Sequence, residues 1–197
     1  MARPPRPERK SELLEQILDF LLDKTLADLT FRSLADGLGI SSYVLVYHFG
    51  NREALVSEII RGIESRFDPY GPGADRLSVD GLILWARAVF EHSLDHRGRH
   101  LQRLEFEAAV QDVVAPQPRG NSATGYLAWC RFLTVWLEHE GVPADEAAVL
   151  GRTFVAALTG VLYDYVIFGD RPAVTASFEK LVDAFIRELS ASRAPLG

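Results

Sequence analysis

Cysteine is almost absent from this sequence, which contains one, Cys130, in 197 residues. A single thiol excludes an internal disulfide framework. The chain also lacks an apolar signal segment after its basic start and any hydrophobic run that approaches a membrane span. We therefore expect a cytoplasmic protein that has no membrane partner.

Sequence motifs of catalysis are missing as well. We find no nucleophile elbow, no phosphate-binding glycine loop and no ligand cluster with metal spacing. Cys130 lies in an apolar segment, where a packed thiol is typically inert. Three histidines are spaced by four residues, namely His92, His96 and His100. A metal site is the less favoured explanation for them, because Gly98 interrupts the predicted helix and helix C-termini also attract histidine. We predict no enzyme, no cofactor and no metal.

What the sequence does contain is a compact helical motif from Thr30 to Arg52, TFRSLADGLGISSYVLVYHFGNR. Thr30 can cap a first helix by accepting a backbone N–H, and Gly39 supplies the freedom to leave that helix. Ser41 or Ser42 can cap a second helix over 43–48. Asn51 can cap a third that runs from Arg52 to about residue 67. Two short helices joined by a glycine turn predict a helix-turn-helix, whose second helix enters the DNA major groove.

Four groups of residues in this stretch recur together in a known family: Leu34-Ala35, Gly39-Ile40-Ser41, Tyr47-His48-Phe49 and Arg52-Glu53-Ala54-Leu55. Their combined spacing resembles the DNA-binding domain of TetR-type (tetracycline-repressor-like) transcriptional regulators over roughly residues 11–66. The sequence departs from the family pattern at Thr25, Ser42, Val46 and Arg52, where glycine, lysine, tyrosine and lysine are usual. With Thr25, the first helix must end without a left-handed glycine.

The expected DNA contacts lie on and beside the second helix of the motif. Serine hydroxyls can bond base edges or phosphates, and Val44 can contact a thymine methyl. Tyr47 and His48 resemble the family's backbone-contacting pair; the alternatives are a half-buried ring and a histidine favoured by the helix dipole. Arg52 opposes the dipole at a helix N-terminus, so a phosphate is the better explanation for it. The full predicted set is Arg32, Ser41, Ser42, Tyr43, Val44, Tyr47, His48 and Arg52.

The charge distribution fits a DNA-binding protein only locally. The net charge is −6. Residues 1–66 hold nine basic and ten acidic side chains, giving −1, and residues 67–197 hold twelve and seventeen, giving −5. Residues 1–10 carry +3 and three prolines, so we predict a flexible basic arm. That arm either contacts DNA or is a solvated tail. DNA binding should be modest and strongly salt-sensitive.

The rest of the chain predicts an all-α fold of about nine helices. We place the boundaries at 1–10 for the arm, 11–66 for a three-helix DNA-binding domain and 67–197 for a second helical domain. Apolar periodicity predicts the first helix at 11–24. It predicts the later helices at 79–96, 99–114, 125–140, 144–168 and 173–190.

The resemblance implies that the second domain binds a small effector and forms a homodimer that recognises two-fold symmetric operator DNA. An apolar pocket would draw on Trp85, Phe90, Phe106, Trp129, Trp136, Phe154 and Tyr163, with Glu105, Glu107, Cys130 or Asp164 as polar anchors. The alternative for each aromatic ring is ordinary core packing. A small-residue face and an apolar stripe on the last two helices predict the dimer interface: Thr153, Ala156, Ala157, Gly160, Phe178, Leu181, Val182 and Phe185.

Together these observations predict a dimeric DNA-binding regulator, a repressor released from its operator by a small, largely apolar effector. One alternative is a helical ligand-binding protein or enzyme in which the N-terminal motif only packs. Another is a TetR-like regulator that has no inducer.

Overall fold

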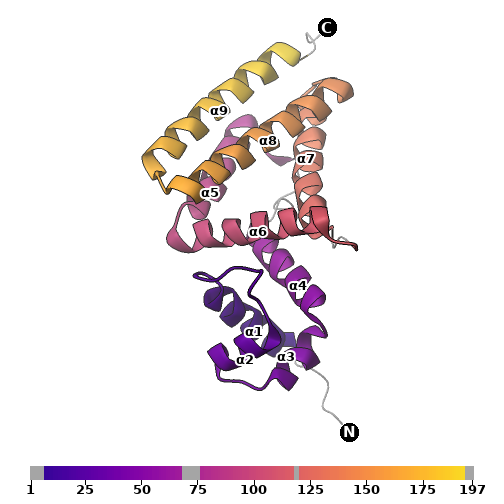
Figure 1. Ribbon diagram of the computed structural model, residues 1–197. Coiled ribbons are helices and arrows are strands. Elements are labelled where there is room, and N and C mark those ends of the chain that lie inside the picture. The colour runs from indigo at the N-terminus through magenta and orange to yellow at the C-terminus, as the bar shows by residue number, and fades with distance from the viewer. Residues whose placement is uncertain (1–6, 68–75, 118–119, 194–197) are drawn as a thin grey trace. The chain divides into compact units, whose positions relative to one another are not determined.

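The computed structural model describes residues 7–67, 76–117 and 120–193, which form helices joined by turns, with no strand among them (Figure 1). The predicted all-α fold is confirmed. The described helices are α1 (Pro7–Phe20), α2 (Phe31–Leu38), α3 (Ser42–Phe49), α4 (Arg52–Glu64), a 3₁₀ turn (Ser65–Phe67), α5 (Val79–Ser93), α6 (His96–Val114), α7 (Asn121–His139), α8 (Ala144–Phe168) and α9 (Arg171–Ser192).

Several helix boundaries differ from the prediction, and local backbone chemistry explains two of the differences. Helix α1 begins at Pro7, inside the predicted arm, since proline is tolerated in the first helical turn, where its missing N–H costs nothing. The predicted arm therefore keeps only residues 1–6, which lie outside the described residues. The break between α5 and α6 falls before Gly98 rather than at it. A Cβ on Gly98 would lie 2.7 Å from the carbonyl oxygens of His92 and Ser93, so the corner requires glycine there.

The chain divides into two compact units that differ from the predicted domains. The first contains Met1–Arg66 and Arg103–Ser122, and the second contains Phe67–Gln102 and Ala123–Gly197. Helix α6 therefore contributes its first residues to the second unit and its remainder to the first. Most of α6 therefore belongs to the same unit as the N-terminal helices, whereas the prediction from the sequence placed the whole helix in the second domain.

The core of the first unit is aliphatic. Helix α1 buries Leu13, Ile17 and Leu18 at helical spacing, as its periodicity predicts. Their buried partners on the following segments are Leu29, Leu34, Leu45, Phe49, Leu55, Ile59 and Ile63. These residues hold α2 and α3 in a fixed arrangement on α1 and α4.

The core of the second unit is rich in aromatic rings. Trp136 is fully buried, and its indole N–H donates to the Leu77 carbonyl at 2.9 Å. A separate cluster forms around Phe90 and Phe178, whose rings stack with centroids 4.0 Å apart. Buried aromatic pairs gain directional stabilisation beyond the burial of their surface.

Candidate nucleic-acid interface

Side-chain caps fix the ends of the helix-turn-helix. Thr30 and Ser33 form a reciprocal capping box, in which the Thr30 hydroxyl accepts from the Ser33 N–H at 3.0 Å. Gly39 ends α2 in the left-handed region with φ of 64°, as predicted. The Asn51 carboxamide oxygen accepts from the Ala54 N–H at 2.8 Å and so starts α4. These local interactions set the angle at which α3 leaves the turn.

Ser41 occupies the cap position of α3, but its side chain makes no capping hydrogen bond. The backbone alone begins this helix, with the Val44 N–H donating to the Ser41 carbonyl at 3.0 Å. The exposed hydroxyl of Ser41 is therefore not used for capping, contrary to the prediction.

Helix α3 has two distinct faces. Leu45 and Phe49 are buried against the rest of the unit. The opposite face exposes Ser42, Tyr43, Val46 and Tyr47, with exposed fractions of 74% for Tyr43, 48% for Val46 and 39% for Tyr47. Large apolar side chains that stay exposed on a short helix mark a surface that contacts something else.

The predicted contact residues divide between this face and its flanks. Ser42, Tyr43 and Tyr47 lie on it, and the two tyrosine rings stack with centroids 6.4 Å apart. Val44 is only partly exposed. The sequence prediction missed Val46, although residues 42, 43, 46 and 47 share one side of a helix that buries residues 45 and 49.

Two further predicted contacts, His48 and Arg32, lie outside this face. The His48 ring packs edge-on against Tyr47 at 5.2 Å, in the last turn of α3. Its Nδ1 is buried and makes no hydrogen bond within the described part of the chain. The dipole explanation for this histidine therefore stays open alongside DNA contact. Arg32 is exposed in the first turn of α2, where a phosphate could approach it.

Arg52 has partners inside the protein. Its guanidinium donates to the Leu29 carbonyl at 2.9 Å and to the Leu26 carbonyl at 2.6 Å. Backbone carbonyls therefore compensate part of the positive charge for which the dipole argument expects a phosphate. The observed partners of Arg52 lie in the connection between α1 and α2, and its contact with DNA stays a prediction.

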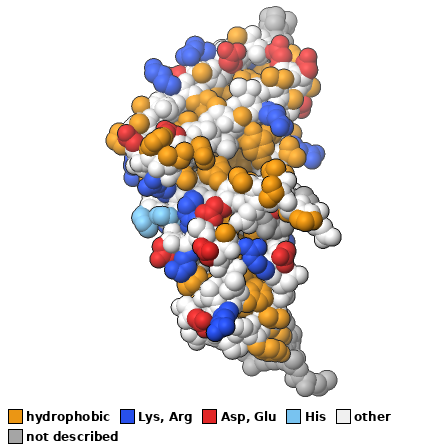
Figure 2. Space-filling model, in the orientation of Figure 1, with side chains coloured by type: hydrophobic (Ala, Val, Ile, Leu, Met, Phe, Trp, Pro, Cys, Tyr) orange, Lys and Arg blue, Asp and Glu red, His pale blue; other side chains and the backbone are white. Residues whose placement is uncertain are grey.

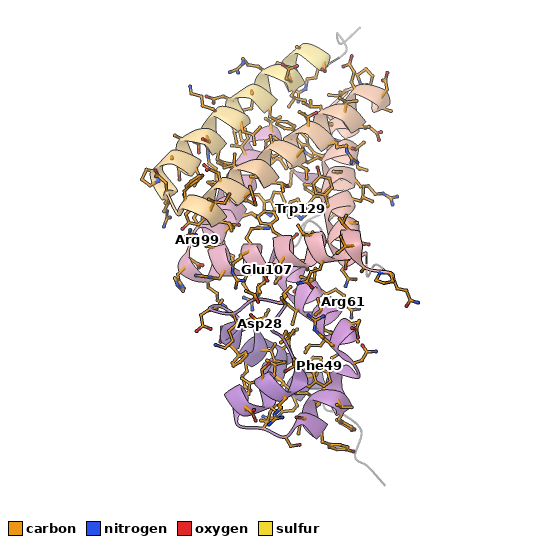
Figure 3. The ribbon with its side chains drawn as sticks, in the orientation of Figure 1. Asp28, Phe49, Arg61, Arg99, Glu107 and Trp129 are labelled. Atoms are coloured by element: carbon orange, nitrogen blue, oxygen red, sulfur yellow. The ribbon has the colours of Figure 1, made fainter. Side chains whose placement is uncertain are left out.

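Helix α6 holds the same connection through two charged side chains. The Arg103 guanidinium donates to the Leu21 and Lys24 carbonyls, both at 2.9 Å, just past the end of α1. The Leu26 N–H donates to the Glu107 carboxylate at 2.7 Å, and Glu107 also pairs with Arg103. In Figure 3, Glu107 on α6 lies beside the segment that carries Asp28.

This clamp explains how α1 ends without the glycine usual in the family. Thr25 stands at that position, and its hydroxyl donates to the Asp28 carboxylate at 2.7 Å. No described non-glycine residue has a positive φ. The backbone N–H groups of Leu21 and Leu22 pair with the last carbonyls of α1, and Arg103 binds the carbonyls of the turn that follows, in place of a left-handed glycine.

Glu64 near the end of α4 has an unusual environment in the first unit. Burial and the nearby Glu105 carboxylate raise the pKa of Glu64 to about 7, against a smaller lowering by Arg61. Its Oε1 atom is buried and makes no hydrogen bond within the described residues. The ionised form is therefore disfavoured at this position.

The predicted dimer residues separate by helix. On α8, Thr153, Ala156, Ala157 and Gly160 are all exposed, and a Cβ on Gly160 would meet nothing within 4 Å. On α9, Phe178, Val182 and Phe185 are buried within their own chain and Leu181 is partly buried. The predicted interface residues of α9 thus pack into the core of their own chain. An amphipathic pattern in the sequence cannot distinguish a core-facing stripe from an interface.

The exposed side of α8 is apolar over most of its length (Figure 2). By length and composition the helix could cross a membrane, yet the same composition occurs in buried helices of soluble proteins. One line of exposed positions along α8 runs at alternating steps of four and three: Val149, Thr153, Ala156, Gly160, Tyr163 and Ile167. This periodicity is that of a helix packed along a partner helix.

The predicted pocket residues lie in different surroundings. Trp136 and Phe90 are core residues of two separate clusters, and Phe154 is buried beside Phe185. Tyr163 is 53% exposed on α8. Phe106 belongs to the first unit.

Two of the predicted pocket residues, Trp85 and Trp129, form a partly buried aromatic pair. Their ring centroids lie 5.4 Å apart, and Phe132 packs against both. Figure 3 shows Trp129 on α7. Two of the predicted polar anchors have other roles. The Glu107 carboxylate accepts a hydrogen bond from the Leu26 N–H and forms an ion pair with Arg103. Burial raises the pKa of the Cys130 thiol, which keeps the thiol protonated.

Comparison with known proteins gives sequence relatives over part of the chain. No known family model matches it. The chain is 31% identical over 117 residues to the HTH-type transcriptional repressor KstR2 of Mycobacterium tuberculosis, covering 56% of this chain and 55% of that protein. It is 36% identical over 81 residues to KstR2 of Rhodococcus jostii, covering 38% and 40%. The chain thus spans about half the length of the curated relatives it matches.

Solved structures resemble the fold over nearly the whole chain. Salmonella enterica GusR superposes with a TM-score of 0.69 at 18% identity, covering 96% of this chain and 98% of that one. A TetR transcriptional regulator from Legionella pneumophila gives 0.66 at 14% identity, with coverages of 94% and 98%. NalD, the secondary repressor of the MexAB-OprM multidrug efflux pump in Pseudomonas aeruginosa, gives 0.62 at 14% identity, with coverages of 92% and 95%.

Proposed function

We propose, from a fold that is that of the TetR-type regulators, that this chain is a cytoplasmic DNA-binding transcriptional repressor. The observation that carries the proposal is the exposed face of α3, which presents Ser42, Tyr43, Val46 and Tyr47 from a capped helix-turn-helix. The sequence similarity to proteins named as transcriptional repressors supports repression as the output.

In this proposal α3 is the recognition helix and enters the major groove. The exposed hydroxyls of Ser41 and Ser42 and the side chain of Arg32 provide phosphate contacts beside it. The stacked rings of Tyr43 and Tyr47 present hydroxyls and ring edges to the DNA. Arg52 also contributes by holding the connection between α1 and α2.

We further propose that two copies dimerise through α8. The stripe from Val149 to Ile167 is exposed in the single chain, and a second copy would bury it. Small residues at Ala156 and Gly160 allow two helices to approach closely. A two-fold axis through this contact would present two recognition helices, and operators for such dimers have half-sites roughly 34–36 Å apart.

The effector site of this proposal lies in the second unit, at the partly buried pair Trp85 and Trp129. Aromatic walls favour a small, largely apolar molecule. Because α6 contributes residues to both units, it is the element through which a bound effector would act. An effector releases the operator only by binding one arrangement of the dimer more tightly than the other.

The DNA-binding proposal is tested by fluorescence anisotropy with the DNA directly upstream of the coding region, against a scrambled duplex, in rising salt. We expect sequence-dependent binding that weakens steeply with salt. Tyr47→Ala should reduce affinity roughly 10- to 100-fold, as loss of an anchoring contact does. Leu84→Ala, which removes a 72% exposed side chain from α5, is the control and should bind as the parent does. Equal binding of the parent to both duplexes, here and in a genome-wide selection, contradicts the proposal.

The dimer proposal is tested by placing a charge on the α8 stripe. Ala156→Arg should convert the dimer to a monomer in analytical ultracentrifugation, because the large charged side chain prevents close helix packing. Ala88→Arg makes the same change at an exposed position of α5 and should leave the dimer intact. A dimer that survives Ala156→Arg would place the interface elsewhere.

A further inference from the structure

The exposed face of α3 has a chemical composition that limits which bases it can recognise. Its four exposed side chains are two hydroxyl-bearing rings, one serine and one valine: Tyr43, Tyr47, Ser42 and Val46. The whole helix, SYVLVYHF, contains no Arg, Lys, Asn, Gln, Asp or Glu. The only ionisable groups on it are the two tyrosine hydroxyls and His48, and His48 is half-buried.

That composition excludes the strong hydrogen-bonding pairs of the major groove. Guanine is recognised by a bidentate Arg or Lys, adenine by a bidentate Asn or Gln, and cytosine by an acidic acceptor. None of these side chains is available on α3. A hydroxyl can make single hydrogen bonds but discriminates poorly, since it serves as donor and acceptor alike.

The one base feature that suits this face is the thymine 5-methyl group. Val46 is 48% exposed, which leaves its methyl groups open to an apolar contact. Tyr43 and Tyr47 lie within one turn of it on the same side of the helix, and their stacked rings widen the apolar surface. Apolar side chains are the usual partners of the thymine methyl in the major groove.

We propose that this protein selects its operator chiefly through thymine 5-methyl groups, contacted by Val46 and the rings of Tyr43 and Tyr47. The inference rests on the proposed DNA-binding function and names the chemistry of its specificity. Burial of one methyl group gives about a fourfold effect on affinity. Several thymines per half-site would therefore be needed for useful discrimination.

The test begins with selection of bound sequences from a random duplex library by the full-length protein. The enriched duplex is then synthesised with deoxyuridine in place of thymidine, one position at a time. Deoxyuridine removes only the 5-methyl group and keeps the base pair. We expect at least two positions per half-site where this substitution weakens binding about fourfold each, as measured by anisotropy.

Variants then assign the contact to α3. Val46→Ala should bind the thymidine duplex more weakly and lose the deoxyuridine penalty at one of those positions. Val135→Ala is the matched control, because it removes a valine that is 45% exposed on α7. It should bind as the parent does and keep the whole penalty.

The possible outcomes separate the two proposals. Failure to enrich any sequence overturns the DNA-binding function and this inference together. An enriched sequence that binds equally with thymidine and deoxyuridine overturns the inference alone. A penalty that is unchanged in Val46→Ala, Tyr43→Ala and Tyr47→Ala places the methyl contact on another segment and overturns the assignment to α3.

Discussion

Different interactions stabilise the inside of each of the two compact units. In the first unit, charged side chains reach backbone groups of the α1–α2 connection: Arg52 from α4, and Arg103 and Glu107 from α6. In the second unit, stacked and tilted rings fill the centre, among them Phe90, Phe178 and Trp136. Single hydrogen bonds to the backbone of a connection can open one at a time, whereas a packed aromatic core loses stability with every ring removed. The comparison assigns adjustability to the first unit and rigidity to the second.

The largest effect that follows from this comparison concerns the core of the second unit. Phe178→Ala removes a ring that is 1% exposed and stacked on Phe90, and should lower the free energy of unfolding by roughly 3–5 kcal/mol. All three tryptophans, Trp85, Trp129 and Trp136, lie in this unit, so tryptophan fluorescence in urea reports on it directly. Leu84→Ala is the exposed control and should shift the midpoint little. A small shift for Phe178→Ala would mean that the core relaxes around the cavity.

A smaller effect is expected at the clamp in the first unit. Arg103→Ala removes the side-chain hydrogen bonds to the Leu21 and Lys24 carbonyls and should cost roughly 1–2 kcal/mol locally. Amide hydrogen exchange of the segment Leu21–Leu29 should become roughly tenfold faster or more, while tryptophan fluorescence stays unchanged.

Arg99→Ala is the matched control for that experiment. Arg99 donates to the Val166 and Ile167 carbonyls at the end of α8, so it performs the same task in the second unit. Its loss should speed exchange around Gly169 and leave Leu21–Leu29 as in the parent. Equal exchange of Leu21–Leu29 in the parent and Arg103→Ala would show that the aliphatic core alone holds this segment.

The smallest effect concerns proton binding at Glu64. Its pKa in the folded state, about 7, lies above the unfolded value, so folding takes up a proton between about pH 4.5 and 7. The stabilisation is present at low pH and is lost as pH rises through 7. Glu64→Gln should therefore raise the melting temperature at pH 8 by the equivalent of about 1 kcal/mol, with little change at pH 4.5. Arg61→Gln should act oppositely at pH 8, because Arg61 favours the ionised form. An identical pH profile for Glu64→Gln and the parent would contradict the raised pKa.

A structural feature could be predicted from the sequence when the residues that determine it lie close together in the chain. Thr30, Gly39 and Asn51 act within four residues of their own position, and each caps its helix as expected. Arg52 was assigned to phosphate by a dipole argument that considered only its own helix. Its observed partners, Leu26 and Leu29, lie more than twenty residues away in sequence, which no local pattern reveals.

The dimer and pocket predictions show the same limit in the second unit. From the sequence we predicted a dimer interface on both the apolar stripe of α9 and the small-residue stripe of α8. Packing decides between them, since Phe178, Val182 and Phe185 turn into their own core while Ala156 and Gly160 face outwards. The aromatic residues chosen for one pocket belong to separate clusters, with Trp136 and Phe154 in one and Phe90 in another.

By itself the sequence determined the helices, the order in which they occur and the helix-turn-helix, because caps, glycine turns and apolar periodicity act over a few residues. The tertiary structure alone decided that Arg52 and Arg103 hold the α1–α2 connection, and that the uncovered apolar face lies on α8 rather than α9. The physical reason is that burial and long-range hydrogen bonding depend on which helices meet, and a periodic pattern is compatible with several such arrangements.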